Sequence, residues 1–239
     1  NWIIIFFFSY LTSAYIAVMM FIVFVTDLFK RITAKEINLI KVFKLSLIFI
    51  CFSFLSLYII GYIEPGTKLS TSGFGIYKAN LATFFDSNDL WSNIFSDIKS
   101  VEGEHEGFAF LGSGIIFLLI TTIFISFYKK KSINLNKILG LKYILIISIL
   151  LFILALSNNI HLSNLNLIYI DLPKFIEKIF GIIRASGRMV WIPFYLIYIL
   201  IFIVINSFDD KKLWRIIIFL ALTVNVIDLN KVSNLFIMK

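Results

Sequence analysis

Charged side chains are scarce in this sequence, and their scarcity excludes an ordinary soluble domain. Of the 239 residues, 15% are charged, 60% are hydrophobic and 27 are phenylalanine. Soluble domains carry roughly 25% charged and 45–50% apolar residues. Apolar runs of about 20 residues recur along the chain, which is typical of membrane-spanning helices. The composition therefore predicts an all-α, polytopic membrane protein.

Cysteine and histidine are nearly absent as well. The one cysteine, Cys51, lies inside an apolar run, so no disulfide can form within the chain. Of the two histidines, His105 lies among glutamates, but the spacing is not the HExxH of zinc peptidases. Asn1 is followed at once by apolar residues, without the charged region that opens a signal peptide. We therefore expect the sequence to be part of a longer chain.

The apolar stretches predict about six membrane spans in a single transmembrane domain, residues 1–239. These spans cover roughly Trp2–Val25, Leu45–Tyr62, Phe108–Tyr128, Tyr143–Ser157, Met189–Ile205 and Trp214–Ile227.

The segments between the predicted spans are polar or amphipathic. The basic stretch 26–44 has apolar residues at helical spacing and is expected to form a helix at the membrane surface. Two long polar loops cover about 63–107 and 158–188. Each is expected to carry an interfacial helix, at 76–95 in the first loop and at Leu172–Ile183 in the second.

The charge distribution predicts the orientation of the chain. Cytoplasmic loops of membrane proteins are enriched in Lys and Arg. With segments 26–44, 128–142 and 206–215 in the cytoplasm, that side holds 13 of the 22 basic residues, and the other side holds 10 of the 14 acidic residues. Both long loops then lie on the periplasmic or extracellular side of a bacterial inner (cytoplasmic) membrane. Because the basic residues lie where this rule expects them, a nucleic-acid partner is not predicted.

Acidic residues crowd together at the end of the first loop. Glu102, Glu104 and Glu106 alternate with other residues just before a span begins. Clustered carboxylates repel one another, so they need a cation or a basic partner nearby. Four interpretations remain open for them: a solvated acidic loop, general acid/base chemistry, a divalent metal such as Mg²⁺ or Mn²⁺, or ion pairs with the second loop.

The second loop supplies the complementary charge. Arg184 and Arg188 are four residues apart, so they share a face if the following helix begins early. Arginine near a membrane is costly unless it is paired, and its planar fork fits carboxylate or phosphate. The alternatives are an ion pair with Glu102–Glu106, contact with lipid headgroups, or binding of a phosphate-bearing lipid substrate.

Several motifs follow one another in a recognisable order. They read GFGIYKANLATFFDS, EGEHEGFAFLGSG, LALSNNIHL, LPKFIEKIFGIIRASGRMVWIPFYLIYIL and NVIDL. As a set they resemble a family of bacterial polytopic membrane proteins that is similar to the GT-C type of integral membrane glycosyltransferase. The resemblance covers roughly Gly61 to Leu229. His105 stands where that family usually has tyrosine, which argues against a catalytic role for this histidine.

The resemblance implies an enzyme of cell-envelope polysaccharide or glycoconjugate synthesis. Such an enzyme takes a sugar from a polyprenyl-phosphate donor on the non-cytoplasmic face. Arg184, Arg188 and Lys78 are then expected to bind phosphate, and Glu104 and Glu106 to be catalytic, positioning or metal-binding residues. In GT-C enzymes the main catalytic acid usually lies near the N-terminus, which would be upstream of Asn1.

A second class of function is a transporter or a non-catalytic scaffold of an envelope-polysaccharide system. A transporter places ionisable residues and broken helices at mid-membrane. The charges here lie at loop edges instead, which favours chemistry at the interface. The sequence specifies neither the sugar, the acceptor, a cofactor nor the oligomeric state.

Overall fold

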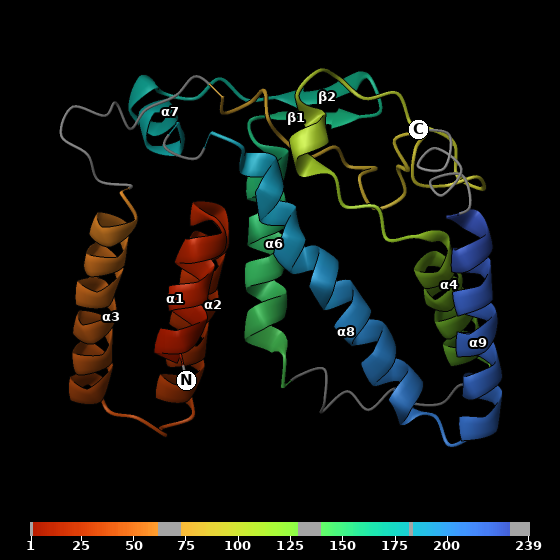
Figure 1. The fold of residues 1–239 in the computed structure, drawn as a ribbon, viewed down its shortest axis with the longest axis horizontal. Coiled ribbons are helices and arrows are strands. Elements are labelled where there is room, and N and C mark those ends of the chain that lie inside the picture. The colour runs from red at the N-terminus through yellow and green to blue at the C-terminus, as the bar shows by residue number, and fades with distance from the viewer. Residues whose placement is uncertain (1, 62–72, 129–139, 182–183, 230–239) are drawn as a thin grey trace.

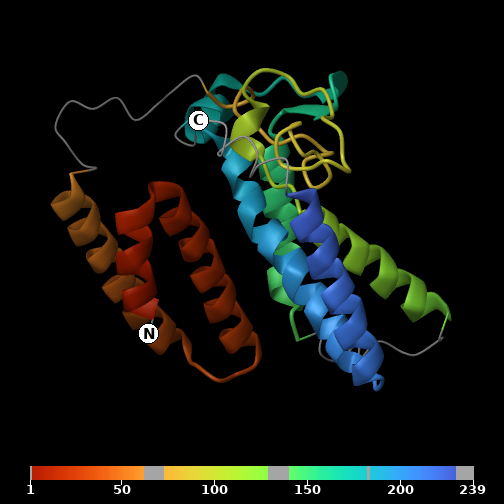
Figure 2. The ribbon, with the colours of Figure 1, turned by 45° about the vertical axis from the view of Figure 1, so that its right-hand side comes forward.

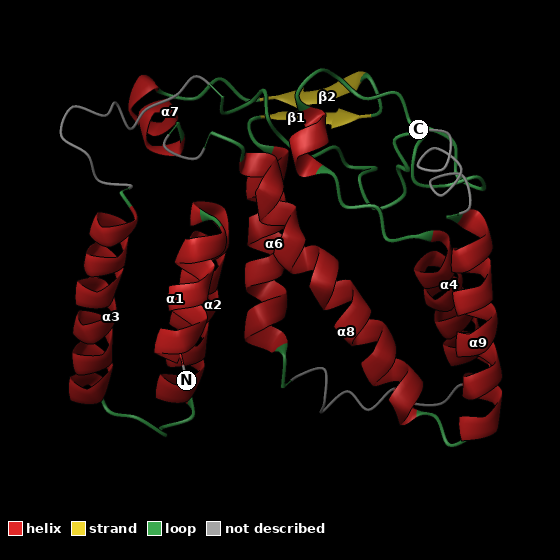
Figure 3. Cartoon of the chain, in the orientation of Figure 1, coloured by secondary structure: helices red, strands yellow, loops and turns green. Residues whose placement is uncertain are grey.

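The computed structural model describes residues 2–61, 73–128, 140–181 and 184–229, and over these residues the protein is mostly helical (Figure 3). The elements are α1 (Trp2–Thr12), α2 (Ala14–Thr33), α3 (Leu39–Ile60), η1 (Glu104–Gly107), α4 (Ser113–Tyr128), α6 (Lys142–Leu156), β1 (Asn159–Leu162), β2 (Leu165–Tyr169), α7 (Lys174–Phe180), η2 (Ser186–Val190), α8 (Trp191–Ser207) and α9 (Lys211–Asp228).

The long helices stand beneath a layer of loops that crosses one end of the molecule (Figure 1). This layer, here called the cap, consists of residues 73–112, 157–181 and 184–190. It contains η1, the β1–β2 hairpin, α7 and η2. Both polar loops of the sequence therefore contribute to the same end of the fold, as the charge pattern predicts.

Three hydrophobic clusters hold the helices together. The first joins α1, α2 and α3 around Phe6 and Phe49. The second joins α2, α6 and η2 around Met19 and Met189, and it continues into the cap. The third joins α4, α8 and α9 around Trp214. The middle cluster is the one that connects the helices to the loops above them.

The predicted first span, Trp2–Val25, is wrong, because the chain reverses in its middle. Ser13 is extended, with φ −169° and ψ 140°, and its side chain caps α2 by accepting a hydrogen bond from the Tyr15 amide. α1 and α2 therefore form an antiparallel helical hairpin (Figure 2). The indole of Trp2 donates to a carboxylate oxygen of Asp27 at 3.3 Å, which joins the start of α1 to the last turns of α2.

The predicted surface helix over residues 26–44 is also wrong. α2 continues to Thr33, and α3 begins at Leu39, where Asn38 accepts a hydrogen bond from the Lys41 amide at 2.9 Å. Only a short turn separates the two helices. The basic residues of this segment therefore lie on the adjoining ends of α2 and α3 and, for Lys35, in the turn between them.

The remaining predicted spans correspond to helices, with shifted ends. Two helical stretches are long and apolar enough to cross a membrane by length and composition, Leu39–Ile60 and Ser186–Ser207. α1, α4 and α6 are apolar but shorter. α4 packs closely on α9, since a Cβ at Gly114 would lie 2.4 Å from the carbonyl oxygen of Ala221.

The predicted interfacial helix at 76–95 does not form, and turns replace it. One carboxylate oxygen of Asp86 accepts from the amides of Asn88 and Ile98 at 2.9 and 3.1 Å, which closes a compact loop. Asn88 and Asp89 both have positive φ, 50° and 52°, which a helix does not allow.

The second loop is closer to expectation. α7 (Lys174–Phe180) lies within the predicted helix Leu172–Ile183, whose residues 182–183 fall outside the described part. The antiparallel β1–β2 hairpin was not predicted, and its bulge between Ile160 and His161 interrupts the alternation that would reveal a strand.

Candidate functional site

Three segments of the cap cross at two glycines. A Cβ at Gly187 would lie 2.7 Å from the backbone carbon of Lys78 and 2.8 Å from the Cα of Gly107. A Cβ at Gly107 would lie 2.4 Å from the Cα of Ala79. The amide of Gly187 donates to the carbonyl of Tyr77 at 3.0 Å. This close approach brings the predicted site residues of both loops together.

Glu106 and Arg188 form an ion pair across the crossing. The Nε and Nη2 atoms of Arg188 both lie 2.7 Å from the same carboxylate oxygen of Glu106. The two side chains are about a third and a quarter exposed, at 31% and 25%. The guanidinium also lies 4.7 Å from the centre of the Tyr15 ring, which comes from α2. The pairing of the two loops, one of the alternatives that the sequence leaves open, is therefore formed directly.

Arg184 lies beside this pair and is more open to solvent. Its guanidinium is 5.0 Å from the ring centre of Tyr77, and its Nη2 donates to the Tyr77 hydroxyl at 3.5 Å. This hydrogen bond raises the pKa of Arg184 further above its usual value. In the described part of the chain no carboxylate makes a salt bridge with Arg184. The Tyr15 hydroxyl accepts from the amide of Ala185 at 2.9 Å. Tyr15 and Tyr77 therefore both contact residues 184–188, here called the arginine turn.

Lys78 and Glu104 face into the cap. Lys78 is 1% exposed, and its ammonium group hydrogen-bonds to Nδ1 of His161 and to the carbonyl of Asn159. Oε1 of Glu104 lies 3.8 Å from Nζ of Lys78 and 3.4 Å from Nδ1 of His161. These two predicted site residues are therefore in contact with each other and with the hairpin, beneath the surface that carries the arginines.

The second oxygen of Glu104 completes this buried cluster. Oε2 accepts from the side-chain amide of Asn80 at 2.8 Å and from the backbone amide of Val101 at 3.0 Å. The Asn80 carbonyl oxygen in turn accepts from the amides of Ala82 and Ser163, at 3.0 and 3.1 Å. Glu104 and Asn80 thus connect the first loop to the hairpin of the second.

Burial changes the proton affinity of this cluster. It lowers the pKa of Lys78 from 10.5 to about 8, and the attraction of Glu104 offsets part of that change. Burial, followed by the positive charge of Lys78, also lowers the pKa of His161. A neutral imidazole that accepts a hydrogen bond at Nδ1 carries its proton on Nε2. Near neutral pH the cluster is therefore a lysine ammonium held by a carboxylate and a neutral histidine.

A divalent metal, one of the alternatives that the sequence leaves open for the glutamates, does not fit these side chains. Glu104 points inward to Lys78 and His161, whereas Glu106 points to Arg188. No group of three or more His, Cys, Asp or Glu side chains suited to a metal ion occurs among the described residues. The positive charge that these carboxylates need is supplied by lysine and arginine.

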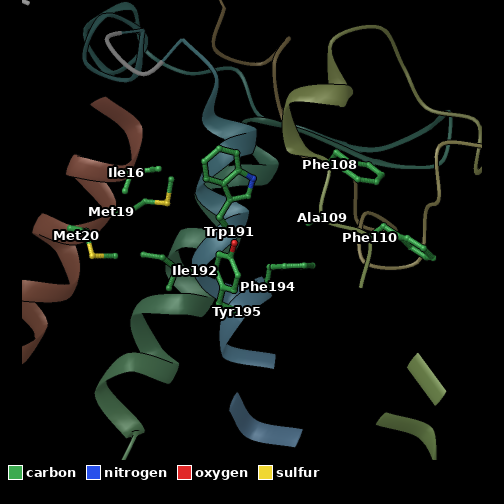
Figure 4. A pocket seen from close by; sticks show the side chains of 10 residues that line it. All are labelled: Ile16, Met19, Met20, Phe108, Ala109, Phe110, Trp191, Ile192, Phe194 and Tyr195. Carbon is green, nitrogen blue, oxygen red and sulfur yellow. The ribbon is translucent and has the colours of Figure 1, made fainter. Parts of the chain in front are cut away.

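An apolar cavity of about 340 Å³ lies at the start of α8 (Figure 4). Its walls come from α2, from the start of α8 and from residues 108–110, and they include Ile16, Met19, Met20, Phe108, Trp191 and Tyr195. Ile16 follows Tyr15, on which Arg188 lies, and Trp191 is one turn beyond Arg188. The cavity walls therefore lie within one turn of Arg188 along the chain, although neither arginine is among the lining residues.

Asp228 is a buried residue that sequence reasoning did not assign to the cap. It ends α9 at 1% exposure, and its carboxylate accepts from the Ser92 hydroxyl and from the amides of Asn93 and Ile94, at 2.7–2.8 Å. His161 and Asn80 were missed as well. Asn80, His161 and Asp228 lie within the motifs GFGIYKANLATFFDS, LALSNNIHL and NVIDL. The order of these motifs along the chain is the sequence signal that could have identified the three residues.

The fold and the site define a helical protein that carries an arginine–tyrosine–glutamate cluster in a polar cap at one end. The chain belongs to the DUF6311 family, described as a domain of unknown function, whose sequence profile matches residues 1–230. No curated protein and no solved structure matches the chain. The resemblance to GT-C glycosyltransferases stays a prediction, since the family description carries no activity.

Proposed function

We propose that the protein is an integral membrane glycosyltransferase that takes a sugar from a polyprenyl-phosphate donor at the non-cytoplasmic face of the membrane. The observation that carries this proposal is the contact of Arg188 with Tyr15, whose neighbour Ile16 lines the apolar cavity between α2 and α8, with Arg184 four residues before Arg188. A polyprenyl-phosphate sugar has the same two parts, an anionic group and a hydrocarbon chain. The arginines would hold the phosphate, and the cavity would take the first part of the chain.

The outer surface of the helices supports a position in the membrane. α3 exposes Phe43, Leu47, Phe54 and Tyr58, and apolar side chains are exposed along α4 and α9 too. Apolar patches of this extent mark a lipid or protein contact. The α2–α3 and α8–α9 turns lie at the end opposite the cap (Figure 1). Lys35 lies in the first turn, and Lys211 and Lys212 begin α9 directly after Asp209 and Asp210, so basic residues gather at this end, as expected of a cytoplasmic side.

The chemistry would use the ion pair between Glu106 and Arg188. In an inverting transfer an acceptor hydroxyl oxygen bonds to C1 of the sugar, the bond from C1 to the phosphate oxygen breaks, and a base takes the hydroxyl proton. Arginines aimed at the leaving phosphate stabilise the charge that develops on it. Glu106 is the carboxylate that contacts an arginine of this site, and it would act as a base or position the acceptor. Lys78 and Glu104, which are buried, would support the site from beneath.

Ligand binding tests this proposal with two variants of opposite expected effect. The probes are a polyprenyl phosphate and the matching polyprenol, which has no phosphate. Arg188→Gln should weaken binding of the phosphate by about ten-fold or more and should leave polyprenol binding unchanged. Glu106→Gln removes the carboxylate that competes for Arg188 and should strengthen phosphate binding by a few-fold, while transfer of the sugar is lost.

The matched control is Lys174→Gln, on the exposed face of α7, which should bind both probes as the wild type does. If Arg188→Gln binds the phosphate as well as the wild type, the arginine turn is not the phosphate site. Tight binding of the phosphate without transfer, in the full-length protein with acceptors supplied, would favour the scaffold or transporter alternative.

A further inference from the structure

A second apolar cavity lies at the opposite end of the molecule, among α1, α2 and α3. Its volume is about 470 Å³. Most of its walls are hydrocarbon and aromatic, including Trp2, Ile4, Phe24, Leu45, Ile48 and Phe49. It has no contact with the cap residues described above, and the donor proposed for that site does not account for it.

Two cationic side chains border this cavity. Arg31 comes from the last turn of α2, and Lys41 from the first turn of α3. The carboxylate of Asp27 is held by the Trp2 indole at 3.3 Å and by Nε of Arg31 at 3.0 Å. The ion pair engages the Nε edge of Arg31 and leaves 47% of its side chain exposed. Asp27 therefore orients Arg31 at the mouth of the cavity.

Two helix ends with opposite dipoles meet at the same place, the C-terminus of α2 and the N-terminus of α3. The N-terminus of α3 carries the positive end of the helix dipole, and its first turn contains no acidic residue. Between residues 27 and 44 the chain has five basic residues, Lys30, Arg31, Lys35, Lys41 and Lys44, against two acidic ones, Asp27 and Glu36. Of these residues, Arg31, Lys41 and Asp27 line the cavity, so its lining has a net charge of +1, which is two minus one.

We propose that this cavity binds an anionic phospholipid, with an acyl chain in the apolar space and the headgroup phosphate between Arg31 and Lys41. Charge complementarity identifies the head, and the hydrocarbon walls identify the tail. A free inorganic anion would leave the apolar walls without a function, and an apolar helix would leave the two cations unmatched. The site needs only the membrane placement of the protein and is independent of sugar transfer at the cap.

Lipid selectivity of the purified full chain in detergent tests this inference. Added phosphatidylglycerol should raise the thermal unfolding temperature more than phosphatidylcholine does, because a ligand that binds the folded state stabilises it. In Arg31→Gln/Lys41→Gln, phosphatidylglycerol binding, counted by native mass spectrometry, should fall by about ten-fold or more. The matched control is Lys174→Gln/Lys178→Gln on α7, which removes the same charge at the other end and should keep the selectivity.

A second variant separates the lipid site from a loss of folding. Ile48 lines the cavity and is 52% exposed, so Ile48→Trp should fill the space with little strain and reduce lipid retention without any change of charge. Selectivity for phosphatidylglycerol that persists in both variants would overturn the proposal. Equal stabilisation by inorganic phosphate alone would do so too, as would a dimer whose interface covers this face. Polyprenyl-phosphate binding is measured with other variants, so the two proposals can fail separately.

Discussion

Glu104 and Glu106 lie two residues apart in one short 3₁₀ turn and have different environments. Glu104 is 5% exposed and faces Lys78 and His161, whereas Glu106 pairs with Arg188 at the surface. The sequence predicts that the acidic cluster needs basic partners, and the structure supplies one for each of these glutamates. The sequence alone could not show which glutamate points inward, because this depends on a 3₁₀ turn of four residues, which is too short to have a hydrophobic periodicity.

The buried lysine has a consequence for stability against pH. The pKa of Lys78 in the folded protein is about 8, below its usual 10.5, so the unfolded chain binds more protons between these values. The free energy of unfolding should therefore rise with pH from about 8 to 10.5, by up to about 3 kcal/mol from this one group. Below pH 8 the contribution of Lys78 should be constant.

Unfolding followed by tryptophan fluorescence at a series of pH values checks this expectation. Lys78→Met should lack this part of the rise, and Lys99→Met, an exposed lysine of the same loop, should keep it. An identical pH dependence in wild type and Lys78→Met would show that Lys78 titrates as an ordinary lysine.

At the scale of elements, long apolar helices were predictable and the reversals between them were not. Five of the six predicted spans correspond to helices, α3, α4, α6, α8 and α9. The first failed because a single serine, Ser13, caps a new helix inside an apolar run, where hydropathy averaged over a window shows no break. The loop helix at 76–95 failed because the side chain of Asp86 bonds to nearby amides and favours turns over a helix.

The crossing of three cap segments makes a prediction at this scale. Gly187→Ala places a methyl group 2.7 Å from backbone of the Lys78 segment, and this segment cannot move aside as a flexible side chain would. We expect a loss of about 1–3 kcal/mol in the free energy of unfolding, together with weaker phosphate binding, because Arg188 is the next residue. Chemical denaturation and the binding measurement check both effects, with Ser100→Ala, at an exposed position of the cap, as the control. Unchanged stability would mean that the crossing is looser than described.

At the scale of the whole molecule, the cap lies at one end of the helices and the α2–α3 and α8–α9 turns lie at the other (Figure 1). The proposed orientation predicts which end an impermeant thiol reagent reaches in intact cells. In a Cys51→Ser background, Ser100→Cys in the cap should be labelled from outside. Glu36→Cys, in the turn between α2 and α3, should be labelled only after permeabilisation. The reverse pattern would invert the orientation, and equal labelling of both in intact cells would mean that no membrane separates them.

The bond between Asp228 and residues 92–94 also bears on how the protein is made. The amides of Asn93 and Ile94 and the hydroxyl of Ser92 find their acceptor on a residue more than 130 positions later in the chain. During synthesis these three donors can reach this acceptor only after α9 has been made. Formation of this part of the cap is therefore expected to follow synthesis of α9, and a chain that ends before Asp228 should leave these donors without this acceptor.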